Sequence, residues 1–73
     1  MRKVYWTSKV GSTDDFGDTV SDIIIDGKTT QGPWALMTPD SYKKHSYFKG
    51  RFGLGMGQKY QKQTDGKWLK IEG

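Results

Sequence analysis

The sequence predicts a small α+β domain, namely a mainly antiparallel sheet or partly open barrel of about five short strands with one short helix. Three observations support this fold class. Apolar and polar residues alternate through residues 2–10, as in a half-buried strand. Two Asp-Gly pairs each stand between strand-forming residues, which is typical of hairpins. A strong helix start, Thr38-Pro39-Asp40, separates the two hairpins.

The N-terminal half is expected to contribute three of the strands. The alternating residues 2–10 form the first of them. Residues 20–25 are rich in β-branched side chains and predict the second. Asp26-Gly27 would end this strand with a two-residue turn, and residues 28–31 would return as the third strand.

The helix is expected over residues 39–47. Thr38 can cap its first turn, and Pro39 suits the first helical position because no hydrogen bond is lost there. Met37 and Tyr42 are spaced to pack against each other around the cap, as a hydrophobic staple.

A second hairpin is predicted around Asp65-Gly66, between residues 60–64 and 67–71. A two-residue turn would place Gln63 opposite Trp68, so that Trp68 lies on a polar, outward face. An exposed tryptophan often marks a contact surface. The core is expected to form from Val4, Trp6, Val20, Ile23, Ile25, Trp34, Leu36, Met37, Tyr42, Leu54, Tyr60, Leu69 and Ile71.

Length and composition narrow the class of protein. The chain has 73 residues, which we interpret as one domain over residues 1–73. It contains no cysteine, so neither a disulfide nor a thiolate zinc site can stabilise the small core. It shows neither a signal peptide nor an apolar run long enough to span a membrane. We therefore expect a soluble, cytoplasmic monomer or small homo-oligomer with no membrane partner.

Charge is distributed unevenly along the chain. Residues 1–40 carry four Lys or Arg against six aspartates, a net charge of −2. Residues 41–73 carry eight Lys or Arg against two acidic residues, a net charge of +6. The basic part is also rich in aromatic residues and glycine. This combination suits a polyanion, because cations neutralise phosphates while aromatic rings stack on bases.

The resulting hypothesis is a non-catalytic binding module for nucleic acid. Six residues are expected to contact phosphates, namely Lys43, Lys44, Lys49, Arg51, Lys59 and Lys70. Phe52 and Trp68 are expected to stack on bases, at about 1–3 kcal/mol per base. The alternative is a protein-interaction or assembly module, such as an inhibitor, an adaptor or a homodimer, that uses the same surface.

Glycines at positions 53, 55 and 57 would leave one face of a strand without side chains. Bare backbone allows close approach by a ligand, by a partner strand or by an aromatic ring of the same chain. In the functional interpretation a nucleic-acid or peptide strand passes over this face. In the structural interpretation, which we favour, a tryptophan covers it.

Signals for catalysis or metal binding are weak. His45 is the only histidine, so neither a metal site nor a catalytic triad has enough imidazole groups nearby. The aspartates of residues 14–18 lack the spacing of a calcium-binding loop and suit turns. Gly27-Lys28-Thr29 matches the end of a phosphate-binding loop, but Asp22 occupies the position of its first glycine. We therefore expect no enzyme, no metal and no cofactor.

Several short segments resemble small uncharacterised proteins of bacterial genomes and prophages. These segments are Asp26-Gly27-Lys28-Thr29, Gly32-Pro33-Trp34-Ala35, Met37-Thr38-Pro39, Gly55-x-Gly57-Gln58-Lys59-Tyr60 and Asp65-Gly66-Lys67-Trp68. The resemblance covers residues 5–73, and segment 46–52 departs from it. It implies an accessory protein of a mobile element, and it carries no activity and no site residue.

Overall fold

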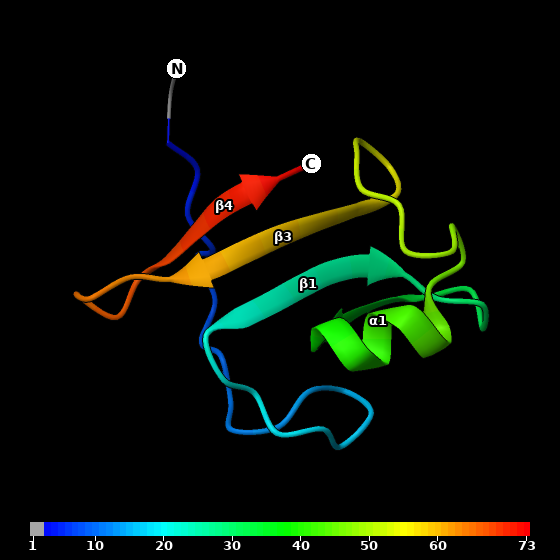
Figure 1. The fold of residues 1–73 in the computed structure, drawn as a ribbon, viewed down its shortest axis with the longest axis horizontal. Coiled ribbons are helices and arrows are strands. Elements are labelled where there is room, and N and C mark those ends of the chain that lie inside the picture. The colour runs from blue at the N-terminus through cyan, green and yellow to red at the C-terminus, as the bar shows by residue number, and fades with distance from the viewer. Residues whose placement is uncertain (1–2) are drawn as a thin grey trace.

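The computed structural model describes residues 3–73, which form a four-stranded antiparallel sheet with one short helix (Figure 1). The strands are β1 (Ile23–Lys28), β2 (Trp34–Met37), β3 (Gly57–Lys62) and β4 (Trp68–Glu72), and helix α1 spans Pro39–His45. The order in the sheet is β2-β1-β3-β4. The predicted α+β class is confirmed, with an open sheet of four strands.

The N-terminal segment does not form the strand predicted for residues 2–10. Within its described part only Tyr5 forms a bridge, with Leu69 of β4. The backbone N–H of Trp6 also donates to the carbonyl of Trp68, at 2.9 Å. The segment therefore follows the outer edge of β4 over a short distance and then leaves it to cross one face of the sheet.

The first hairpin has its turn in a different place from the predicted one. Asp26-Gly27 lies inside β1, so the turn predicted there is wrong. The chain reverses over residues 29–33, where the N–H and the hydroxyl of Thr29 both donate to the carbonyl of Pro33, at 3.1 and 2.8 Å. Gly32 supplies the positive φ, 108°, in this turn. The predicted third strand is accordingly displaced to β2.

The helix begins as predicted. The hydroxyl of Thr38 accepts a hydrogen bond from the N–H of Ser41 at 3.2 Å, and a proline occupies the first turn. Met37 and Tyr42 are buried in the same cluster, as the staple requires. The helix ends at His45, shortly before the predicted limit.

The second hairpin is present, but its loop has three residues, Thr64-Asp65-Gly66. Gly66 has a φ of 88°, the left-handed conformation that the last position of such a loop requires. As a result Lys62 lies opposite Trp68, in place of the predicted Gln63. A register shift of one residue moves a side chain to the other face of a sheet. Trp68 therefore points inward and is only 8% exposed.

The sheet carries a small core on each face. One contains Ile24, Tyr60 and Trp68, and is covered by partly buried Trp6, Val10, Val20 and Leu36. The other contains Ile25, Met37 and Tyr42, and is covered by Phe16, Ala35 and Phe52. Four residues predicted for the core are exposed instead, namely Val4, Trp34, Leu54 and Ile71. The layers are thus the N-terminal segment, the sheet, and α1 with its neighbouring loops.

Candidate functional site

The structure divides the eight predicted site residues between two parts of the molecule. Six come from α1, from the segment after it and from the nearby start of β3, namely Lys43, Lys44, Lys49, Arg51, Phe52 and Lys59. The other two, Trp68 and Lys70, belong to β4 on the far edge of the sheet. Lys70 pairs with Tyr60, whose side chain belongs to the core opposite α1. The eight residues therefore do not form one surface.

The predicted exposure of Trp68 is wrong. Its side chain packs in the core with Ile24 and Tyr60. The ammonium group of Lys62 stands 6.0 Å from the centroid of its ring. A base cannot stack on this ring without displacing its neighbours, so Trp68 is not available as a stacking residue for nucleic acid.

Phe52 is also largely occupied by contacts within the chain. Its ring lies 5.3 Å from that of Tyr42, centroid to centroid, in a stacked arrangement. The ammonium group of Lys59 stands 5.5 Å from the centroid of Phe52, and 3.8 Å from a carboxylate oxygen of Glu72. Phe52 therefore links Lys59 in the first half of β3 to Tyr42 of α1.

Residues 46–51, here called the basic loop, bring cations and aromatic rings together in an exposed place. Tyr47 is 53% exposed, and its ring meets that of Phe48 edge-on at 4.9 Å. Tyr47, Phe48, Lys49 and Arg51 line a shallow groove of about 230 Å³. The ammonium group of Lys28 stands 4.7 Å from the Tyr47 ring. Our sequence-based site contained Lys49 and Arg51 but neither Tyr47 nor Lys28.

Lys49 adopts a backbone conformation that disfavours lysine. Its φ is 56°, and it is the only residue other than glycine with a positive φ in residues 3–73. Gly50 follows with a φ of 83°, and the N–H of Arg51 donates to the carbonyl of Phe48 at 3.2 Å. A turn with two such central residues favours Asn-Gly. Lysine in this conformation costs about 1 kcal/mol, so a cation occupies the tip of the loop at the expense of stability.

The acidic loop of residues 14–18 has a structural role centred on Asp14. One oxygen of this carboxylate accepts from the N–H groups of Phe16 and Asp18, at 2.9 and 2.8 Å. The other oxygen accepts from the N–H of Thr38 at 2.8 Å. Burial alone favours the neutral carboxyl, but the Ser41 hydroxyl and these N–H groups outweigh it and lower the pKa of Asp14. The carboxylate thus ties the loop to the start of α1.

The same loop covers part of the sheet edge formed by β2. The N–H of Leu36 in β2 donates to a carboxylate oxygen of Asp15 at 2.8 Å, and the N–H of Asp15 donates to the carbonyl of Leu36 at 3.0 Å. At the opposite edge, the backbone N–H of Trp6 donates to the backbone carbonyl of Trp68 in β4. Both edges are therefore partly covered, which limits pairing with a strand of another chain.

Asp26 shows the opposite electrostatic behaviour to Asp14. Its side chain is partly buried in β1, and burial, followed by the nearby charge of Asp15, raises its pKa. The folded state therefore holds the proton more tightly than the unfolded state, and stability falls as the pH rises above the ordinary value of 3.8. We expect Asp26→Asn to raise the free energy of unfolding at neutral pH by about 0.5 kcal/mol.

Urea unfolding of both proteins, at neutral pH and at about pH 3, tests this expectation. The gain should disappear at the acidic pH, where Asp26 itself is protonated. A variant that is less stable than the wild type at neutral pH would contradict it.

His45, the only histidine, stacks on Phe16 with the ring centroids 3.9 Å apart and the planes 6° from parallel. Its position is therefore explained by packing. Within residues 3–73 no three His, Asp or Glu side chains are grouped so as to hold a metal ion. The described part of the chain also has no helix that is long and apolar enough to cross a membrane.

Comparison with known proteins gave no relative of this chain. No protein-family model, no curated protein and no solved structure matches it. Its function is therefore inferred from its own residues.

Proposed function

We propose that the protein is a non-catalytic, cytoplasmic module that binds nucleic acid through the basic loop and the adjacent end of α1. The main support is Lys49, an exposed cation in a conformation where glycine or asparagine would be more stable. A strained residue that the fold does not need is a sign of function. The resemblance to small prophage proteins adds the proposal that the module serves a mobile element.

The proposed contacts differ from those expected from the sequence. Lys49 and Arg51 of the basic loop, with Lys43 and Lys44 on the exposed side of α1, would bind phosphates. The exposed ring of Tyr47, beside them, replaces Trp68 and Phe52 as the stacking surface. Flexible single strands suit such a site, because their bases are free to stack on a side chain.

Fluorescence anisotropy with a labelled single-stranded oligonucleotide, repeated over a range of salt concentrations, tests the proposal. Four neutralised phosphates predict that the logarithm of affinity falls with the logarithm of salt at a slope of about −3. Lys49→Asn is expected to flatten this slope by roughly 0.7 while raising stability by about 0.5–1 kcal/mol, because asparagine tolerates the positive φ. Tyr47→Ala should weaken binding about fivefold or more.

Lys67→Asn is the matched control. It removes the same charge from an exposed lysine in the β3–β4 hairpin, away from the basic loop. It should leave the slope nearly unchanged. Equal losses for the Lys49 and Lys67 variants would indicate attraction by net charge alone and would overturn the proposed site.

The alternative is a protein-interaction or assembly module, and Leu54 favours it. This side chain is 91% exposed at the tip of the turn formed by residues 53–57. An apolar residue so placed gains stability only by meeting another surface. Undetectable oligonucleotide binding at low salt would shift the choice to this alternative.

A further inference from the structure

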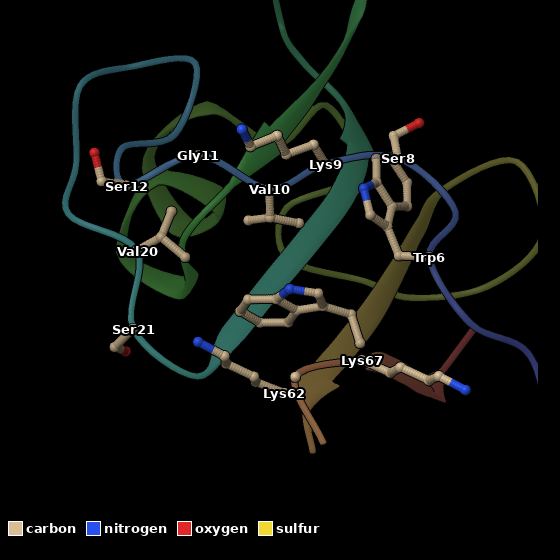
Figure 2. A pocket seen from close by; sticks show the side chains of 12 residues that line it. Trp6, Ser8, Lys9, Val10, Gly11, Ser12, Val20, Ser21, Lys62 and Lys67 are labelled. Atoms are coloured by element: carbon tan, nitrogen blue, oxygen red, sulfur yellow. The ribbon is translucent and has the colours of Figure 1, made fainter. Parts of the chain in front are cut away.

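A groove of about 640 Å³ lies on the face of the sheet opposite α1, between the N-terminal segment and the β3–β4 hairpin (Figure 2). Its walls include the apolar side chains of Trp6, Val10, Val20 and Trp68. The volume falls within the range of about 300–1,000 Å³ that is usual for small-molecule sites. The groove is separate from the basic loop and does not depend on the function proposed there.

The charged side chains that line the groove are all positive. Lys9, Lys62 and Lys67 line it, and none of its lining residues is acidic. Figure 2 shows the ammonium groups of Lys9 and Lys62 on opposite sides of Val10 and Val20, whereas Lys67 points away. The lining combines apolar side chains with three serines and these lysines, which suits a ligand with a flat ring, polar edges and an anionic group.

One donor at the groove is not satisfied within the protein. The indole nitrogen of Trp6 is buried and has no hydrogen-bond partner among residues 3–73. In Figure 2 this nitrogen lies on the edge of the ring that faces Val10. A buried donor without an acceptor is unfavourable, and an acceptor atom on a bound ring would remove that penalty. A ligand that fits this groove therefore needs a hydrogen-bond acceptor for the Trp6 N–H as well as an anionic group for the lysines.

We propose that this groove binds a small planar anion with the size and chemistry of a mononucleotide. The phosphate lies between Lys9 and Lys62, and the planar ring contacts Val10 and the exposed margin of Trp68. The Trp6 indole, whose nitrogen is buried in the free protein, turns on binding so that its N–H meets an acceptor atom of the ring. Lys62, which stands over the Trp68 ring in the free protein, moves toward the phosphate on binding.

The experiment is a titration of the ¹⁵N-labelled protein with adenosine monophosphate at low salt, followed by ¹H–¹⁵N correlation spectra. The chain has three tryptophans, so each indole N–H gives its own signal. Trp34 is 43% exposed on β2, outside the groove, and serves as an internal control. The Trp6 signal should move saturably and the Trp34 signal should not. The absence of saturable movement of Trp6 up to about 10 mM ligand would overturn the proposal.

Two double variants that each remove two positive charges test the role of Lys9 and Lys62. Lys9→Gln with Lys62→Gln should weaken binding about tenfold, whereas Lys43→Gln with Lys44→Gln, which removes the same charge from α1, should not. Equal weakening by both pairs would overturn the site. The dispersion of the backbone amide signals shows that each variant is folded.

Three further ligands define the chemistry. Adenosine and inorganic phosphate, each alone, should bind more weakly than the nucleotide. If inorganic phosphate moved the Trp6 signal as strongly as the nucleotide does, the planar ring would contribute nothing to binding, and the proposed ring contacts would be wrong. An oligonucleotide that moves the Trp6 signal at lower concentration than the mononucleotide would assign the groove to a nucleic-acid interface and overturn the small-molecule site.

Discussion

Replacing Asp14 by asparagine is expected to lower the free energy of unfolding by about 2–4 kcal/mol, a large part of the stability of a domain this small. The carboxylate accepts three backbone N–H groups, from Phe16, Asp18 and Thr38. Asparagine has a single acceptor oxygen, and its amide group would face at least one of these donors. Urea unfolding followed by circular dichroism measures the loss.

Asp22→Asn is the matched control for this change. Asp22 is exposed, and its carboxylate accepts a hydrogen bond from the neighbouring Ser21 hydroxyl at 3.3 Å. We expect an effect within about 0.5 kcal/mol. If the Asp14 and Asp22 variants were equally stable, the acidic loop would not anchor α1 as described.

The effect of the Asp14 substitution depends on pH in a defined direction. The folded state lowers the pKa of Asp14, so the unfolded state binds the proton more readily. The carboxylate's contribution is fully present above the ordinary pKa of 3.8 and is lost as the pH falls through the folded value. The stability difference between the wild type and Asp14→Asn should therefore narrow below pH 3.8. A gap that stays constant there would exclude the ionised carboxylate as its source.

The start of α1 could be predicted from the sequence because its determinants are local. The cap, the proline and the staple all lie within residues 37–42, and each acts on its immediate neighbours. The predicted fold class follows from similarly local signals, namely strand-forming runs and breaks. These local signals do not determine which residues of neighbouring strands pair across the sheet.

The position of Trp68 shows how a small error in a turn changes a predicted site. An Asp-Gly pair fits both a two-residue loop and the three-residue loop observed here, with Gly66 in the left-handed conformation. The two loops differ by one residue in register, and that residue decides whether Trp68 faces the solvent or the core. Loop length depends on packing of both strands, which the local sequence does not specify.

The basic loop was only partly predictable for a similar reason. Lys49 and Arg51 could be proposed from composition, because charged residues in a glycine-containing segment are usually exposed. The contribution of Lys28 could not, since it lies in β1 and reaches Tyr47 only through the fold. Their contact follows from a backbone hydrogen bond, from the N–H of Tyr47 to the carbonyl of Lys28 at 2.9 Å.

Gly27→Ala is expected to destabilise the protein by about 2–3 kcal/mol, although alanine is normally no worse than glycine in a strand. Gly27 of β1 pairs with Gly57 of β3, and the ring of Tyr42 lies over this bare backbone. A Cβ at position 27 would stand 2.5 Å from a ring carbon of Tyr42. The ring cannot easily withdraw, because its hydroxyl donates to the carbonyl of Arg51.

The glycine-rich segment of residues 53–57 differs from the bare strand expected from the sequence. Gly53 and Gly55 belong to a tight turn with φ values of 145° and 78°, so the expected bare strand over residues 53–57 does not exist. The bare surface instead spans two neighbouring strands, at Gly27 and Gly57, and a tyrosine covers it where a tryptophan was expected.

Gly11→Ala provides the control, because the nearest atom to a Cβ at position 11 is 3.8 Å away and no positive φ is required. It should change stability by less than about 1 kcal/mol, with a gain the more natural outcome. The cause of the Gly27 effect can be isolated in a Tyr42→Leu background. There the ring is absent, and Gly27→Ala should cost under about 1 kcal/mol more. An undiminished cost in that background would mean that the backbone at position 27, and not the tyrosine ring, excludes a side chain.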